Sequence, residues 1–157
     1  LVDLLNTIFK RFDQLAVRHQ LEKIKTIGDA YLVVGGLSID NPNHINSIIN
    51  MGLDMNRAIS EVNDILNHNL SIRIGIDCGS VIAGVIGENK FIYDLWGDTV
   101  NTASRMESTG IKGYLQVTES VYRKTYSTFD FEHRGNIEVK GLGSINTFIL
   151  NSKSDEG

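Results

Sequence analysis

Helical and strand patterns alternate along this chain, but they do so irregularly. Over residues 1–18, and after Pro42 as far as residue 66, apolar residues recur at three and four positions and predict two amphipathic helices. Short runs rich in β-branched and aromatic residues lie between these stripes and after them. A doubly wound parallel sheet needs a regular repeat of strand and helix, which this order does not supply. The chain is therefore predicted to be an α+β fold, with a mixed, mostly antiparallel sheet covered by helices.

A hairpin is expected between the two helices. Residues 23–27 and 30–34 resemble strands, and Gly28-Asp29 separates them at the tip. From 70 to 76, apolar and polar residues alternate and predict a half-buried strand. The other expected elements are a short strand or turn at 81–86, a strand at 93–96, a helix at 99–108 capped by Asp98, a strand at 114–117, a helix capped by Thr118 and ending near 126, and antiparallel strands at 129–133, 137–140 and 145–150.

Length and composition indicate one globular domain. The chain has 157 residues, of which 41% are hydrophobic and only one is proline, so the disordered and low-complexity classes fit poorly. Its net charge of −4 comes without a basic block, which argues against general nucleic-acid binding. Any bound phosphate must therefore be met by a few placed cations. We expect the domain to cover residues 1–150, followed by a polar tail from 151 to 157.

Cysteine use and hydropathy bear on the compartment. Cys78 is the one cysteine, so an intramolecular disulfide and a zinc ribbon are excluded, and a reducing, cytoplasmic compartment is expected. No run is long and apolar enough to span a membrane, and no membrane contact by the domain itself is expected. The chain begins inside an amphipathic pattern, which is typical of a cut from a longer parent; attachment of that parent to a membrane stays open.

Several polar residues lie where they could carry chemistry, although each also has an ordinary structural reading. Asp29 at a hairpin tip suits a turn, but a carboxylate on a rigid tip also suits Mg²⁺ or Mn²⁺. Asn101 and Arg105 share one helix face and could meet a ribose and a phosphate, or simply be solvated. Lys25 and Asp94 lie in apolar strands, as edge charges or as an aimed donor and acceptor.

Three stretches together resemble the class III nucleotidyl cyclases. They are KIKTIGDAYLVVGG (23–36), IRIGIDCGSVIAGVIG (72–87) and YDLWGDTVNTASRMESTG (93–110), and the similarity continues through LQVTESVY (115–122) and EVKGLG (138–143). The resemblance implies a ferredoxin-like βαβ core with additional strands and helices. It also implies conversion of ATP to 3′,5′-cyclic AMP and pyrophosphate.

The resemblance assigns a role to each candidate residue. Asp29 corresponds to the second metal-binding aspartate, and Lys25 with Asp94 to the pair that selects the purine. Asn101 with Arg105 corresponds to the pair that acts on the transition state. Lys140, which by itself would be taken for an exposed turn lysine, corresponds to the phosphate-binding lysine. A lysine donor and an aspartate acceptor complement N1 and N6 of adenine, whereas guanine reverses both groups, so ATP is the expected substrate.

The resemblance further implies two Mg²⁺ or Mn²⁺ ions per complete site and a head-to-tail homodimer with a second cyclase domain. The family's first metal aspartate lies in a segment of the form F-x-D-[IL]-x-G-[FY]-[ST], which this sequence does not contain. We therefore expect the 157-residue chain itself to be nearly inactive and its parent to be a cyclase.

Three other functions stay in view. A cyclase-like domain used for dimerisation or nucleotide sensing would bind ATP analogues without turnover. A guanylyl cyclase would typically carry an acid at the position of Lys25. A cyclic-dinucleotide synthase of related core is disfavoured because its GGDEF-type hairpin is replaced here by TIGDAY.

Overall fold

The structure is a computed structural model that describes residues 2–88 and 92–151. Its contacts divide the chain into two compact units. Unit 1 comprises Leu1–Leu70 and Ala83–Leu95, and unit 2 comprises Ser71–Ile82 and Trp96–Gly157. Each unit is thus built from two separate stretches of sequence. Apart from Asn151, the predicted polar tail lies outside the described residues.

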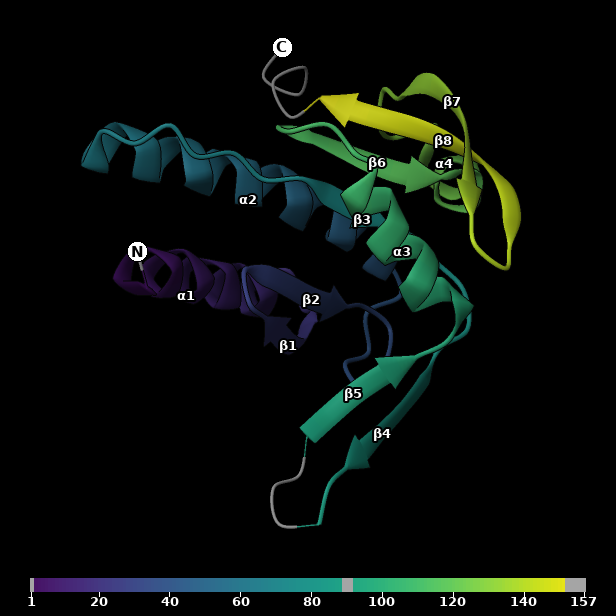
Figure 1. Ribbon diagram of the computed structural model, residues 1–157, viewed down its shortest axis with the longest axis horizontal. Helices are drawn as coiled ribbons and strands as arrows, with labels where there is room; N and C mark the ends of the chain where they lie inside the picture. The colour runs from purple at the N-terminus through teal and green to yellow at the C-terminus, as the bar shows by residue number, and fades with distance from the viewer. Residues whose placement is uncertain (1, 89–91, 152–157) are drawn as a thin grey trace. The chain divides into compact units, whose positions relative to one another are not determined.

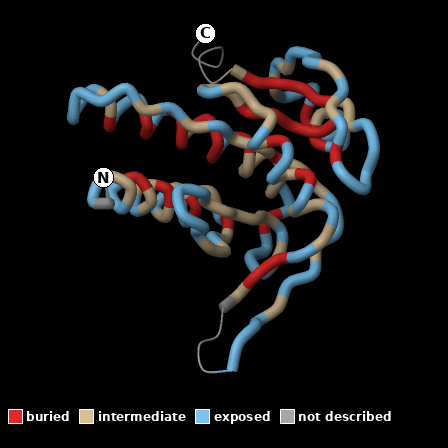
Figure 2. The backbone as a smooth tube through the Cα atoms, in the orientation of Figure 1, coloured by how far each residue is buried: buried red, intermediate tan, exposed pale blue. Residues whose placement is uncertain are grey.

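Unit 1 combines two helices with two hairpins (Figure 1). Its elements are α1 (Val2–Arg18), β1 (Glu22–Ile27), β2 (Ala30–Val34), α2 (His44–Leu66), β4 (Ile82–Ile86) and β5 (Ile92–Trp96), of which β4 begins and β5 ends one residue inside unit 2. The predicted apolar stripes are buried where α1 and α2 pack together, with Phe12 and Ala16 on α1 and Ile49 and Val62 on α2 (Figure 2). Both predicted helices are confirmed.

The predicted hairpin is formed by β1 and β2. The two strands pair in antiparallel fashion with Ile27 opposite Ala30, which leaves Gly28 and Asp29 as a two-residue turn. Gly28 has φ of 59°, a left-handed conformation that a glycine adopts without steric strain. The strands therefore bring Asp29 to an exposed tip.

Unit 2 is a four-stranded mixed sheet with two helices. Its elements are β3 (Ile74–Ile76), α3 (Asp98–Ser108), β6 (Tyr114–Thr118), α4 (Glu119–Thr125), β7 (Glu132–Val139) and β8 (Gly143–Asn151). The strand order is β3-β6-β8-β7, with β3 and β6 parallel and the other pairs antiparallel. Leu115, Val117 and Val121 are fully buried in this unit. The predicted α+β class with a mixed, mostly antiparallel sheet is confirmed.

Three local predictions were wrong in detail. The strand expected at 70–76 is formed only at Ile74–Ile76, and the strands expected at 129–133 and 137–140 are one bulged strand, β7. Asp98 does not cap α3: the N-cap is Gly97, with no side-chain cap, and Asp98 is the first helical residue. Thr118 does cap α4, because its side chain accepts a hydrogen bond from the Val121 N–H.

In the part of the chain that the structure describes, no helix combines the length and hydropathy required to span a membrane.

Candidate active site

α3 presents two polar side chains on its exposed face. Asn101 and Arg105 are one helical turn apart and both are exposed, whereas the residues that follow each of them, Thr102 and Met106, are buried. The burial of one face fixes which side of the helix remains available. The predicted pair is therefore held side by side by the packing of α3.

A pocket lies beside this face of α3. It has a volume of about 480 Å³ and is lined by Asn101, Arg105, Val139 and Lys140. β7 ends at the buried Val139, so the strand anchors the chain immediately before Lys140. The volume falls within the range of roughly 300–1,000 Å³ that is typical of small-molecule sites. The fold thus brings three of the six predicted site residues to one pocket within unit 2.

The polar groups around this pocket are available to a ligand. Among the described residues, no hydrogen-bonding or ionic partner is found for the Arg105 guanidinium, the Asn101 amide or the Lys140 ammonium. Within residues 2–88 and 92–151 these two cations have no ionic partner, and in a chain of net charge −4 such a pair beside an amide suits an anion. A guanidinium and an ammonium together suit phosphate oxygens.

The predicted purine pair forms within unit 1. Lys25 on β1 donates from Nζ to Oδ2 of Asp94 on β5 over 2.8 Å, and the Leu95 backbone N–H donates to the other carboxylate oxygen, also over 2.8 Å. The hydrogen bonds from Lys25 and from Leu95 lower the pKa of the buried Asp94 carboxyl. Asp94 is therefore an ionised acceptor beside a cationic donor at neutral pH.

Asp29 does not complete a metal site with the other described residues. Its side chain is exposed at the β1–β2 tip, and no three His, Cys, Asp or Glu side chains gather to hold a cation within residues 2–88 and 92–151. The described residues thus supply one candidate carboxylate rather than a full coordination shell.

Gly75 on β3 is a site determinant that the sequence analysis missed. A Cβ at this position would lie 2.6 Å from the carbonyl carbon of Met106, and closer still to Ala103 O and Glu107 N. Only a residue without a side chain lets α3 rest directly on β3. The available signal was a glycine inside an alternating strand pattern, which often marks a close backbone approach.

Comparison with known proteins places these features in a family. The family described as "Adenylate and Guanylate cyclase catalytic domain" matches residues 1–152. An adenylate cyclase of Mycobacterium tuberculosis is 41% identical over 150 residues, which cover 96% of this chain and 34% of the relative. The rat guanylate cyclase soluble subunit beta-2 is 40% identical over 162 residues, covering 99% of this chain and 24% of that protein. The chain thus spans about a third or less of the length of these relatives.

Solved structures agree with the sequence matches. The guanylate cyclase domain of RhGC from Catenaria anguillulae, in complex with GTP, aligns with a TM-score of 0.88 and 37% identity, covering 94% of this chain and 81% of that one. The adenylyl cyclase CyaB from P. aeruginosa shares the fold, with a TM-score of 0.90 at 24% identity over 96% of this chain and 81% of that one. The chain belongs to the class III adenylate and guanylate cyclase catalytic domains.

Proposed function

We propose that this cyclase domain is an adenylyl cyclase that converts ATP to 3′,5′-cyclic AMP and pyrophosphate. The observation that carries the choice of purine is the 2.8 Å contact between Lys25 and Asp94. A guanylyl cyclase is the second candidate, because relatives of both names match this chain with similar identity.

Hydrogen-bond chemistry favours adenine at this pair. Lys25 uses one of its three N–H donors on Asp94, and the others can reach an acceptor such as adenine N1. The Asp94 carboxylate accepts and does not donate at neutral pH, which suits the amino group at N6. Guanine places a donor at N1 and an acceptor at O6, so each contact would meet a group of the wrong kind.

The cyclisation itself is an internal displacement at phosphorus. The ribose 3′-oxygen forms a bond to the α-phosphorus, the bond from that phosphorus to the bridging oxygen of the β-phosphate breaks, and the hydroxyl proton passes to solvent. In this proposal Asn101 orients the ribose, Arg105 meets the charge that grows on the α-phosphate, and Lys140 binds the distal phosphates. Catalysis by these residues is positioning combined with electrostatic stabilisation.

Divalent ions and a second subunit belong to the proposal as well. Family resemblance supports Mg²⁺ or Mn²⁺ as the cofactor and Asp29 as one ligand, but the described residues do not form a complete metal site, so no step here is assigned to the ion. We infer a homodimer in which a second copy supplies the remaining part of each site.

The substrate is tested by competition between ATP and GTP. The two nucleotides are supplied together, and initial rates are measured for this chain and for any longer native protein that contains it. A fluorescent ATP analogue reports binding where turnover is low. ATP should be preferred in both assays. A preference for GTP would replace the proposal by the guanylyl alternative, and binding without turnover in the longer protein would indicate a nucleotide-sensing domain.

The role of Arg105 is tested with a matched arginine. In the longer native protein that contains this chain, Arg105→Ala should lower turnover by roughly 10²–10³-fold, as loss of a donor to developing charge typically does. Arg123→Ala is the control, because Arg123 lies on the exposed surface of α4 and pairs only with Glu119 among the described residues. Equal activity of the two variants would contradict the assignment.

A further inference from the structure

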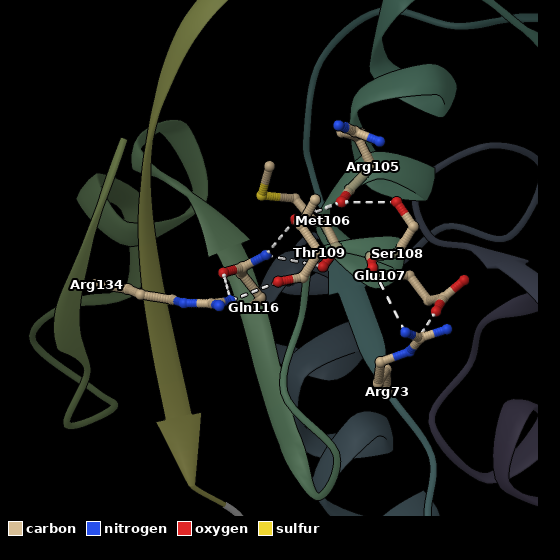
Figure 3. A network of polar contacts seen from close by, with 8 residues as sticks. All are labelled: Arg73, Arg105, Met106, Glu107, Ser108, Thr109, Gln116 and Arg134. Carbon is tan, nitrogen blue, oxygen red and sulfur yellow. Dashed lines mark hydrogen bonds and ion pairs between the residues drawn. The ribbon is translucent and has the colours of Figure 1, made fainter. Parts of the chain in front are cut away.

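The C-terminal end of α3 is held by side chains from two strands (Figure 3). The last four carbonyls of any helix lack partners within the helix, so they need donors from elsewhere. In α3, the Arg105 carbonyl accepts from the Thr109 hydroxyl over 2.7 Å and from the Thr109 N–H over 3.0 Å. The Met106 carbonyl accepts from Gln116 on β6. The helix end is therefore capped by its own residue Thr109 and is also tied to the sheet through Gln116.

Gln116 is the centre of this network. Its side chain is fully buried, and it lies opposite Gly75 in the parallel pair of β3 and β6. Its Nε2 donates to the Met106 carbonyl and to the Thr109 hydroxyl, each over 2.9 Å. Its Oε1 accepts from Arg134 over 2.6 Å. A buried amide with both its donor and its acceptor groups engaged is rigid, since loss of any one partner would leave a polar group unsatisfied.

Arg134 joins this amide to the helix from β7. One of its guanidinium nitrogens donates both to Gln116 and to the Thr109 carbonyl, each over 2.6 Å. The positive charge also lies at the negative end of the α3 dipole, where it is favourable. Arg134 thus contacts the same residue, Thr109, that holds the backbone of Arg105.

Arg134 lies at a bulge in β7. His133 pairs with Phe148 and Gly135 pairs with Thr147, so Arg134 between them has no partner in the ladder. Bulges re-aim side chains and are frequent next to active sites. Figure 3 shows the Arg134 side chain extending from its strand across to Gln116. The irregularity in the strand therefore coincides with the one residue of β7 that reaches α3 in this network.

The same strand also ends at the pocket. β7 carries Arg134, finishes at Val139 in the pocket wall, and is followed by Lys140. One strand thus supports one side of the pocket and, through Arg134, fastens the helix that forms the other side. A displacement of α3 along this junction would change the separation of Arg105 from Lys140.

We propose that Arg134 is a positioning residue for cyclisation, acting through Gln116 and Thr109 to set the place of Arg105 relative to Lys140. The inference rests on the proposed function, in which Arg105 meets the transition state. Arg134 itself does not contact the substrate.

The test is a double-mutant cycle between Arg134→Met and Arg105→Ala in the longer native protein that contains this chain, measured as kcat and KM for ATP with Mn²⁺ supplied. An error of about 1 Å in placement can lower the rate roughly 10²-fold, so Arg134→Met alone should lower kcat by about 10- to 100-fold with a smaller change in KM. In the Arg105→Ala background the same change should alter kcat by less than about twofold, because the group that it positions is gone. Arg123→Met is the control and should match the wild type.

Two outcomes would overturn the inference. The first is a kcat of Arg134→Met equal to that of Arg123→Met. The second is an equal loss of kcat when Arg134→Met is added to the wild type and to Arg105→Ala, which a general effect on stability would give. If that longer protein binds ATP without turning it over, the proposed function fails, and amide hydrogen exchange in this chain tests the network by itself. Exchange at residues 105–110 should accelerate in Arg134→Met and not in Arg123→Met. Unchanged exchange in Arg134→Met would show that Arg134 does not hold the end of α3.

Discussion

Replacing Gly75 by alanine tests whether the close packing of α3 on β3 controls catalysis. The new Cβ would lie 2.6 Å from the Met106 carbonyl carbon, whereas ordinary contact begins near 3.4 Å, so the helix has to retreat by at least about 0.8 Å in this tightly packed region. Overpacking of this kind typically costs about 1–3 kcal/mol of folding free energy. A shift of about 1 Å at Arg105 should lower kcat by roughly 10²-fold, because transition-state contacts depend steeply on placement.

The control separates displacement from loss of stability. Gly113 has φ of 84°, and a Cβ at this position would have no atom within 4 Å, so Gly113→Ala strains the backbone without pressing on the helix. The left-handed conformation costs roughly 1–2 kcal/mol for a residue with a side chain. Urea unfolding should show comparable destabilisation of the two variants, and cyclase assays of the longer native protein that contains this chain should show a large fall in kcat only for Gly75→Ala. Unchanged kcat in Gly75→Ala, or an equal fall in both, would refute the reasoning.

Other perturbations probe the remaining assignments. Lys25→Glu should abolish the preference for ATP over GTP in competition assays, and a retained preference would remove Lys25 from base selection. Chains carrying Asp29→Ala mixed with chains carrying Arg105→Ala should regain activity if sites are shared between two copies, whereas no recovery on mixing would argue against the dimer. Burial raises the pKa of the Asp77 carboxyl despite hydrogen bonds from Thr118 and the Cys78 N–H, so ionisation disfavours the folded state. Asp77→Asn should therefore raise the unfolding free energy at pH 7, with the gain disappearing as pH falls below the ordinary carboxyl range; a gain that persists in acid would contradict this.

Local periodicity predicted the elements well because their cause is local. The stripes of α1 and α2 and the Gly28-Asp29 turn follow from spacing and backbone preference, which the sequence displays directly. Where two local signals compete, the prediction failed. Gly97-Asp98 offers both a flexible residue and a capping side chain, and the structure uses Gly97 with φ of 125° as the N-cap.

The candidate site was recognisable only in part, because its geometry depends on residues distant in sequence. Lys25 and Asp94 are 69 residues apart, and strand pairing rather than spacing joins them. The two strands expected at 129–133 and 137–140 are one strand in the structure, with a bulge at Arg134 beside the contact of this residue with Gln116. No periodic pattern marks such a contact, although a glutamine inside the apolar run of β6 was a signal that a buried amide needed partners.

Residues 83–95 belong to unit 1 although residues 71–82, which precede them, belong to unit 2, and this matters for any division of the protein into fragments. A cleavage between Leu70 and Ala83 would divide Lys25 from Asp94, although both belong to the same unit. A fragment ending at residue 70 would keep α1, α2 and the first hairpin but lose Asp94, the acceptor of the pair that we propose selects the purine. Under that proposal, complementary halves divided between residues 70 and 83 would discriminate between nucleotides only after reassociation, which makes this boundary suitable for a split-protein reporter.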